Sequence, residues 1–427
     1  MESSEAPEAA TGKRQQLSKG MEHIRYAVTY EPLPRTASAT PSSPPSETLP
    51  TEPSSDSPTT YGVPNTLINP PRAPPSRSHD PMNNQKRSDP FQFGSRYLEE
   101  GDNIFEFNAW DHVETDAVYQ EFASQQFDFQ RSNPVSDLEK PKYNTDPAKW
   151  WNKFYSNNTS NFFKDRKWLK QEFPILGEIT EENTGEKILL EVGAGAGNTA
   201  FPVLQLNQNP LLKVHACDFS KKAVELIREN DAYGPANAQG RIQADVWDLA
   251  SSTELPPHVT PGSVDVVMMI FTFSALAPSQ WIQAVSNVWT VLKPGGQVLF
   301  RDYGRGDLAQ VRFKKGRYLE ENFYVRGDGT RVYFFEEEEL RRIWTGQQKK
   351  GEEAEAASGD APSPIQDDLS TAVERLNVDS TVEAPATPSF EVENLGVDRR
   401  LLVSRQRKLK MYRCWMQAVF RKPLEGA

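Results

Sequence analysis

Large apolar residues are scarce at the start of the chain and then recur in regular patterns. Residues 1–88 are rich in Pro, Ser, Thr and Glu. Such a segment buries too little surface to offset the entropy of ordering, so we predict a disordered tail. From residue 147 onward, short apolar runs of strand length alternate with longer amphipathic segments. This alternation predicts helical crossovers between parallel strands.

The core predicted from this alternation covers residues 147–345. One helix begins after Asp146-Pro147, and a second covers the aromatic segment from Phe162 to Leu169. The turn Gly327-Asp328-Gly329, between two aromatic runs, predicts a hairpin. The other strands are predicted at 187–192, 212–217, 240–245, 264–271 and 297–302, and the other helices from about 198, at 221–229 and at 279–291.

Three flanking regions differ from this core. Residues 89–146 are rich in aromatic side chains and predict an N-terminal extension that packs on the core. Residues 346–389 are acidic and rich in Ala, Ser and Pro, which predicts a disordered insertion. Within 390–423, the runs 390–395 and 409–420 predict two strands that complete the sheet. The expected fold is α/β, with a mostly parallel sheet and an antiparallel last strand.

Charge is unevenly distributed along the chain. The formal net charge is −11, but residues 351–389 hold nine acids against one base and residues 399–427 hold nine bases against one acid. A second basic stretch at 301–335 contains Lys314 and Lys315. Clustered bases form a footprint for phosphate groups, although a solvated basic face has the same composition.

Several classes of protein are disfavoured by composition. Cys217 and Cys414 stand far apart in strand-like runs, which argues against a disulfide framework. The five His are scattered and no paired metal motif occurs, so we expect no metal. No apolar run reaches the length of a membrane span, so we expect no membrane partner. The first residues are acidic and lack an apolar signal core, which indicates a cytoplasmic protein.

The strongest local motif is a glycine-rich turn between a strand and a helix. Residues 188–192 form an apolar strand that carries Glu191, and Gly193, Gly195 and Gly197 follow at alternate positions. A dinucleotide site would require glycine where Asn198 stands. The spacing instead resembles that of class I S-adenosylmethionine (SAM) methyltransferases. By itself, the motif is also compatible with a tight turn that binds nothing.

Two acids and a turn follow in the order that such a cofactor site requires. Asp218 ends the next strand, 21 residues after Gly197, where an acid accepts hydrogen bonds from ribose hydroxyls. Asp245 ends the third strand, where an acid can accept from the adenine amino group. Lys293-Pro294-Gly295-Gly296 precedes the fifth strand. Each feature alone is ordinary, since Asp218 also suits a helix N-cap, but together they indicate a SAM site.

Longer motifs narrow the resemblance. The motifs concerned are 151–155 (WNKFY), 161–166 (NFFKDR), 190–199 (LEVGAGAGNT), 217–220 (CDFS), 301–304 (RDYG), 322–330 (NFYVRGDGT) and 398–400 (DRR). Through these motifs the chain resembles the tRNA 3-methylcytidine methyltransferases of the methyltransferase-like family. The region 96–113 resembles the branch that has an N-terminal extension, which includes the fungal enzymes. Ala194 and the acidic insertion depart from the family pattern.

The resemblance implies SAM-dependent methylation of N3 of a cytidine in the anticodon loop of threonine or serine tRNAs. It implies tRNA as partner and leaves room for an accessory protein such as an aminoacyl-tRNA synthetase. The extension at 89–146 would bind tRNA. The residues implied are Trp151, Tyr155, Gly193, Gly195, Asp218, Asp245 and Ile270 for SAM, Phe162, Asp302 and Tyr303 for the target cytosine, and Arg166, Arg399 and Arg400 for tRNA phosphates. From the basic stretch, Lys314 and Lys315 are further candidates for phosphate contacts, although each alone is more often a surface charge.

Ordinary structural roles remain open for several of these residues. Trp151 and Tyr155 have the i, i+4 spacing of core packing. Asp302 would equally suit an ion pair with Arg301 or Arg305.

The expected methyl transfer needs no general base, and the sequence shows no obvious one. The lone pair on N3 of neutral cytosine can attack the sulfonium methyl group directly, and Asp302 would stabilise the cationic product electrostatically. A methyltransferase acting on a protein or small molecule is one alternative, and a catalytically silent RNA-binding scaffold is another. The basic C-terminal segment argues against the first, and the intact glycine turn argues against the second.

Overall fold

The computed structural model describes residues 98, 101–166, 168–347 and 388–424. The predicted tail at 1–88, the first part of the predicted extension and nearly all of the predicted insertion at 346–389 lie outside these residues.

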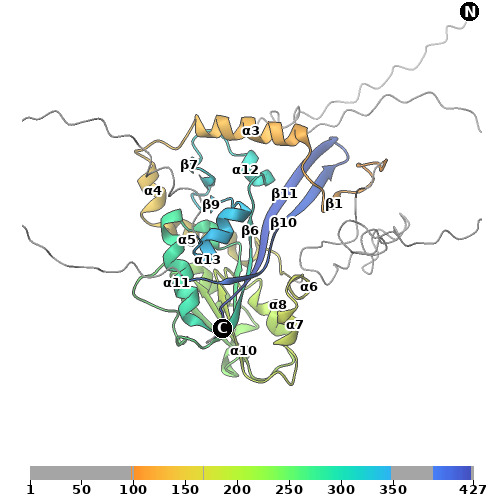
Figure 1. Ribbon diagram of the computed structural model, residues 1–427. Helices are drawn as coiled ribbons and strands as arrows, with labels where there is room; N and C mark the ends of the chain where they lie inside the picture. Colours follow the sequence, from red (N-terminus) through yellow and green to blue (C-terminus); the bar gives the residue numbers. More distant parts are fainter. Residues whose placement is uncertain (1–97, 99–100, 167, 348–387, 425–427) are drawn as a thin grey trace, which may run out of the picture.

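A large mixed sheet forms the centre of the protein (Figure 1), with strand order β1-β10-β11-β6-β5-β2-β3-β4. The strands from β4 to β6 pair in parallel, whereas β11 is antiparallel to both β6 and β10. The prediction of a mostly parallel sheet with an antiparallel last strand is therefore confirmed. The strands are β1 (Ala109–Asp111), β2 (Lys187–Val192), β3 (Leu212–Asp218), β4 (Ile242–Val246), β5 (Val264–Ile270), β6 (Leu292–Tyr303), β10 (Glu391–Ser404) and β11 (Leu409–Arg421).

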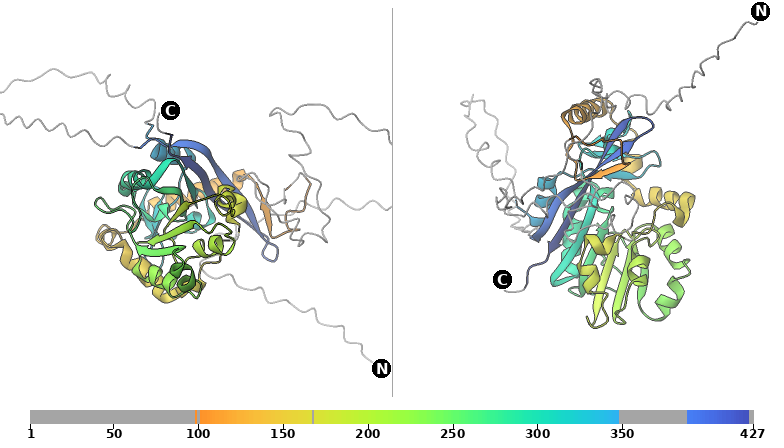
Figure 2. Two further views of the ribbon diagram at one scale, coloured as in Figure 1. Left: turned by 90° about the horizontal axis from the view of Figure 1, so that it is seen from below. Right: turned by 90° about the vertical axis from the view of Figure 1, so that its right-hand side faces the viewer.

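Helices cover both faces of this sheet, because consecutive residues of a buried strand point to opposite sides. Leu190 packs into the cluster that contains α11 and α13, and Leu189 packs into the cluster on the other face. The two helical layers are visible in Figure 2. The first layer contains α11 (Trp281–Val291) and α13 (Glu337–Thr345); the second contains α6 (Leu169–Glu172), α7 (Ile175–Glu178), α8 (Ala200–Gln205), α9 (Lys221–Arg228) and α10 (Tyr233–Ala238).

The N-terminal extension packs on the outer edge of the sheet. Its strand β1 pairs with β10, so that Trp110 lies opposite Leu401. Tyr119 and Phe122 bury their rings against the β10–β11 hairpin and α12. Figure 1 shows this long hairpin reaching from the sheet toward α3. The elements that surround it are α3 (Ala117–Arg131), α4 (Lys140–Asn144) and α12 (Leu308–Val311).

A small sheet and short 3-10 turns complete the fold around the ends of the central strands. The predicted hairpin is confirmed, because β8 and β9 pair antiparallel across the turn at 326–330. The remaining elements are β7 (Tyr318–Glu320), β8 (Phe323–Val325), β9 (Arg331–Tyr333), α5 (Pro147–Asn158), η3 (Thr159–Asn161), η4 (Phe273–Ala275) and η5 (Pro278–Gln280).

Three local predictions were wrong. No helix covers 162–166, the described residues that follow η3: Thr159 ends α5 with a φ of 53°, and the chain turns back so that the N–H of Arg166 donates to the Asn198 carbonyl at 2.9 Å. The predicted turn at 293–296 lies inside β6, where its pairing with β5 shifts register. The strand predicted at 390–395 continues to Ser404, because its whole length pairs with β11.

Candidate functional site

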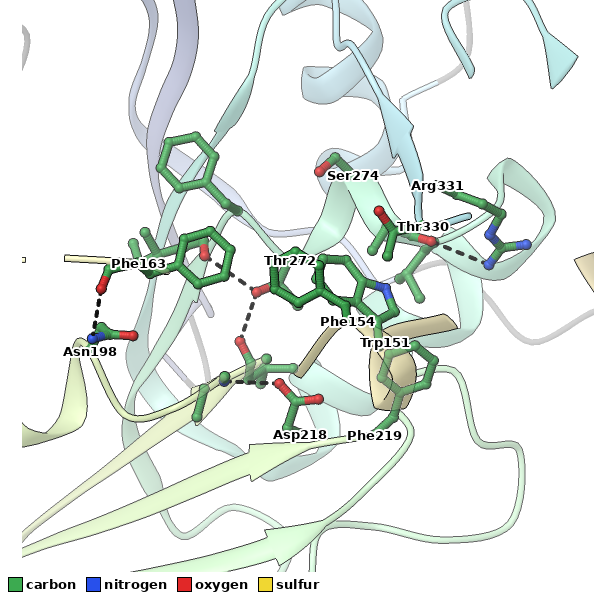
Figure 3. A pocket seen from close by; sticks show the side chains of 18 of the residues that line it. Trp151, Phe154, Phe163, Asn198, Asp218, Phe219, Thr272, Ser274, Thr330 and Arg331 are labelled. Carbon is green, nitrogen blue, oxygen red and sulfur yellow. Dashed lines mark hydrogen bonds between the residues drawn. The ribbon is translucent and has the colours of Figure 1, made fainter. Parts of the chain in front are cut away.

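A cavity of about 500 Å³ opens at the carboxyl ends of the parallel strands. The strand order reverses between β2 and β5, since β3 and β4 continue on one side of β2 and β6 follows β5 on the other. Ligands of open α/β sheets bind at such a switch point. Gly193 follows β2 and Thr272 follows β5, and both line the cavity. Figure 3 shows the cavity and ten of its lining side chains by name.

The glycine turn runs along the floor of the cavity, and neighbouring side chains leave no room for larger residues there. Gly193 has a φ of +68°, and a Cβ at that position would lie 2.3 Å from Thr272 Oγ1. Gly195 has a φ of +59°, and its Cβ would lie 2.6 Å from the Tyr155 hydroxyl. Both positions therefore require glycine for backbone conformation and for space. The turn exposes backbone to the cavity, as a polar ligand would require.

Asp218 is positioned at the end of β3 by two backbone groups. Its carboxylate oxygens accept from Gly195 N–H at 2.9 Å and from Ser220 N–H at 2.8 Å. Burial raises the pKa of Asp218 to about 6, against the lowering effect of these two hydrogen bonds. The carboxylate retains free lone pairs that can accept from the hydroxyls of a ligand.

Asp245 and Asp248 differ in their access to the cavity. Asp245 lies within β4 and forms an ion pair with Arg228 at 3.0 Å; it is not among the residues that line the cavity. Asp248, three residues further on, does line it, together with Trp247 and Leu249. The sequence analysis did not identify Asp248. Its position as an acidic residue just after the predicted strand would have made it a candidate.

Arg166 lies beside the glycine turn. Its Nη1 donates to Thr199 Oγ1 at 2.5 Å and lies 3.9 Å from a carboxylate oxygen of the buried Glu191. Burial raises the pKa of Glu191 to about 7, opposed by the charge on Arg166. Arg166 also lines the cavity, and its two partners, Glu191 and Thr199, stand at the two ends of the glycine turn.

Aromatic side chains form one wall of the cavity. Trp151 and Tyr155 stack with ring centroids 6.1 Å apart, and both line the cavity while packing α5 onto α9. The packing role of this pair is therefore confirmed, and its role in binding SAM stays a prediction. Phe162 packs edge-on against Phe154 at 4.9 Å and remains 55% exposed. Ile270, at the end of β5, also contributes to the lining.

Asp302 and Tyr303 point to opposite sides of β6, as neighbours in a strand do. Tyr303 lines the cavity and lies 5.0 Å from the ring of Phe271. Asp302 is fully buried and does not line the cavity. Its carboxylate accepts from Ser274 N–H and from Tyr303 N–H, both at 2.9 Å. The alternative ion pair is not formed, because Arg301 pairs with Glu172 and Asp398, and Arg305 pairs with Glu336 and Glu321.

Arg399 and Arg400 are likewise divided between the two faces of β10. Arg399 forms an ion pair with Glu114 at 2.9 Å. Arg400 pairs with Asp111 at 2.7 Å and stands opposite Arg413 in the register, on the face that carries Trp415. Neither lines the cavity, and the exposed Lys314 and Lys315 do not either. These four residues are therefore outside the cavity, and both arginines contact the extension.

The C-terminal strand contributes a cavity wall that sequence reasoning missed. Trp415 and Arg413 of β11 line the cavity, as does Trp168. The guanidinium of Arg301 lies 5.1 Å from the Trp168 ring and 5.0 Å from the Trp415 ring, and that of Arg413 lies 4.8 Å from Trp415. These cations hold the indoles by cation–π contacts. No local pattern signals this wall, since it depends on the pairing of β6 with β11.

Within the described part of the chain, no group of three or more His, Cys, Asp or Glu side chains could hold a metal ion. In the same residues, no helix is long and apolar enough to span a bilayer.

Comparison with known proteins agrees with this geometry. A family profile described as "Methyltransferase domain" matches residues 190–298. The tRNA(Thr) (cytosine(32)-N(3))-methyltransferase of Saccharomyces cerevisiae is 47% identical over 78% of this chain and 46% of its own length. The chain thus spans about half of that relative.

Other relatives match along nearly their whole length. The tRNA N(3)-methylcytidine methyltransferase of Schizosaccharomyces pombe is 42% identical over 77% of this chain and 92% of its own. A human tRNA N(3)-cytidine methyltransferase is 35% identical over 78% of this chain and 94% of its own. Identity of this extent, across a relative's full length, shows family membership. The chain therefore belongs to the family of tRNA N(3)-methylcytidine methyltransferases.

Proposed function

We propose that the protein transfers a methyl group from SAM to N3 of a cytidine in the anticodon loop of tRNA, on threonine tRNAs, serine tRNAs or both. The observation that carries this proposal is the cavity at the β2–β5 switch point, in a chain whose similarity covers nearly the whole length of relatives named for this reaction.

The residues around the glycine turn fit SAM. Asp218 has free lone pairs for the ribose hydroxyls, and Trp151 offers an aromatic face beside it. We propose that Arg166 holds the carboxylate of the cofactor, which revises its expected role in binding tRNA phosphates. Its burial beside Glu191 and Thr199 supports this assignment. For the adenine amino group, the position of Asp248 in the cavity makes it a stronger candidate than Asp245.

The aromatic walls fit an extruded base. N3 lies on the Watson–Crick edge of cytosine, so the base must be unpaired and turned out of its stack. Phe162 and Tyr303 offer rings for stacking, which is worth roughly 1–3 kcal/mol per base. When bound, SAM supplies an electrophilic methyl group, and the protein's own contribution is to hold N3 in line with it. No side chain needs to remove a proton, because neutral N3 already has a lone pair.

The tRNA backbone would be bound outside the cavity. We propose Arg400, Lys314 and Lys315 as phosphate contacts, with Arg399 on the opposite face of the same strand. The described part of the extension, residues 101–146, holds ten acids and three bases. We therefore propose that it supports tRNA binding by fixing the β10–β11 hairpin, since its carboxylates pair with Arg399 and Arg400. An accessory protein and a cytoplasmic setting stay predictions.

The test is nucleoside analysis of tRNA after reaction. The full chain is incubated with SAM and unmodified threonine or serine tRNA, and digested nucleosides are measured by mass spectrometry. We expect 3-methylcytidine, and we expect its loss when Asp218→Ala is used. Labelled methyl appearing only in protein or small molecules would overturn the proposal in favour of the first alternative. Tight tRNA binding with no methyl transfer to any acceptor would favour the silent scaffold.

A further inference from the structure

A cation of the cavity wall lies past the end of the parallel strands. The pairing of β11 with β6 begins at Trp415, opposite Tyr303, so Arg413, two residues earlier in β11, lies beyond the last paired residue of β6. On its other side, Arg413 is the register partner of Arg400 in β10. Arg413 lines the cavity and Arg400 does not, so these two arginines stand at its rim.

Two contacts fix the guanidinium of Arg413. Its Nε donates to Asp307 Oδ2 at 2.8 Å, and its Cζ lies 4.8 Å from the centroid of the Trp415 ring. Asp307 is fully buried, and its carboxylate accepts the backbone N–H groups of Ala309 at 2.8 Å and Cys414 at 2.9 Å. A guanidinium held in this way loses little conformational entropy when it binds a ligand.

Both Nη groups of Arg413 remain available. No described residue accepts a hydrogen bond from either of them, and the side chain is 28% exposed. The other arginines that line the cavity are Arg166, Arg326 and Arg331, and each donates an Nη hydrogen to an oxygen of the protein. Among the described arginines of this wall, Arg413 is therefore the one that keeps both Nη groups for a ligand.

The surroundings of Arg413 favour an anionic ligand over a neutral one. Asp307 pairs with Arg413 and Asp111 pairs with Arg400, and both carboxylates are buried. The two arginines are 28% and 32% exposed, so the charge that this pair presents at the surface is positive. Like charges at register positions of paired strands repel each other, and an anion at the rim would reduce that repulsion.

The position suits the backbone of a nucleotide whose base enters the cavity. Tyr303, proposed above to stack on that base, and Arg413 are diagonal neighbours on adjacent antiparallel strands, and such neighbours lie about 7–8 Å apart. This spacing is comparable to the distance between the base and the phosphate of one nucleotide. The glycine turn, where the carboxylate of SAM is proposed to lie, follows β2 and is separated from β11 by β5 and β6.

We propose that Arg413 binds a phosphate group adjacent to the target cytidine of tRNA, with Asp307 as the residue that positions its guanidinium. This inference rests on the proposed function. The planar fork of a guanidinium matches two oxygens of a phosphate, so the two Nη groups can bind it together. A contact at the rim fixes the sugar–phosphate chain while the base occupies the cavity.

The test neutralises single phosphates of the tRNA. Two full-length tRNAs carry one uncharged methylphosphonate each, on the 5′ or the 3′ side of the target cytidine, and gel-shift titrations with S-adenosylhomocysteine present measure their affinities. In wild-type protein, we expect one of these changes to weaken binding about tenfold. In Arg413→Gln the same change should have no further effect, and the dependence of affinity on salt should fall by about one phosphate contact.

Arg421 provides the matched control. It lies on the same face of β11 at the other end of the strand, where it pairs with Glu391 at 3.0 Å. Arg421→Gln should keep the wild-type sensitivity to the methylphosphonate. Arg413→Gln leaves the buried Asp307 without its partner, which destabilises a folded protein. The double variant Asp307→Asn/Arg413→Gln removes both charges and should show the same loss of sensitivity.

Calorimetry separates a tRNA contact from a cofactor contact. Arg413→Gln should bind S-adenosylhomocysteine with the wild-type affinity, because the proposed partner is a phosphate of the tRNA. A loss of about tenfold would assign Arg413 to the cofactor and overturn the inference.

The inference and the proposed function can fail separately. If neither methylphosphonate weakens wild-type binding, or if the loss persists in Arg413→Gln, while wild-type protein still produces 3-methylcytidine, the inference is wrong and the function stands. If wild-type protein produces no 3-methylcytidine from any tRNA, the proposed function itself has failed.

Discussion

Binding of S-adenosylhomocysteine should weaken as the pH falls, through protonation of Asp218. Burial raises the pKa of this carboxyl to about 6 in the folded protein. Above that pH the carboxylate can accept two ribose hydroxyls, and below it a proton competes with them. If the ionised form binds, about one tenth of the protein is competent at about pH 5 and nearly all at about pH 8. The dissociation constant should therefore increase about tenfold over this range.

Isothermal titration calorimetry across this pH range measures the effect. Asp218→Asn keeps the shape but loses the charge, and charge-assisted hydrogen bonds contribute about 1.5–3 kcal/mol. We expect this variant to bind at least about tenfold more weakly at about pH 8 and to lose most of the pH dependence. Glu191, whose pKa burial raises to about 7, provides the control: Glu191→Gln should leave the slope between about pH 5 and about pH 6 in place. A flat wild-type profile, or an unchanged slope in Asp218→Asn, would refute the reasoning.

Three further predictions concern the stability of the β8–β9 hairpin and the binding of cofactor and tRNA. Gly329→Ala should destabilise the protein by about 1–3 kcal/mol in thermal melts, because its Cβ would lie 2.1 Å from a tryptophan ring at a φ of +91°, whereas Gly327→Ala, with open space around it, should melt like wild type. Arg166→Ala should weaken S-adenosylhomocysteine binding at least about tenfold in calorimetry while changing tRNA affinity little; the reverse pattern would return this residue to the tRNA surface. Arg400→Ala should weaken tRNA binding in gel-shift titrations and make the affinity less dependent on salt concentration. Arg399→Ala should have a smaller effect, because Arg399 lies on the opposite face of the strand. Equal losses of affinity in the two variants would contradict this division.

Local patterns were sufficient to predict the parallel core and the glycine turn. Apolar runs bounded by glycine and acids identify β2 and β3, so Gly193 and Asp218 could be placed from sequence alone. The alternation of polar and apolar residues along β11 also predicted a strand there, although it does not give the direction of that strand. In each case the signal lies within about ten residues, where periodicity is informative.

The positions of the residues expected to contact the substrate could not be predicted from local patterns. The strand predicted at 390–395 stops short of the true end of β10. Arg399 and Arg400 therefore fell outside the predicted strands, where both could face one ligand. Strand alternation separates them, as it separates Asp302 from Tyr303. The wall formed by Trp168 and Trp415 depends on pairing between distant segments, which one sequence does not reveal. The position of Arg166 beside the glycine turn depends on a loop whose composition resembles that of a helix.

The pairing of β1 with β10 has a consequence for how the protein folds. Trp110 and Leu401 are register partners although 291 residues separate them in the chain. A ribosome must therefore complete nearly the whole polypeptide before this contact can form, and such non-local contacts slow folding. Until then β10 presents an open edge to other molecules, and open edges are sites of aggregation. The short strand β1 thus acts as a late closure of the sheet, and its loss should reduce the yield of monomeric protein before it reduces any binding constant.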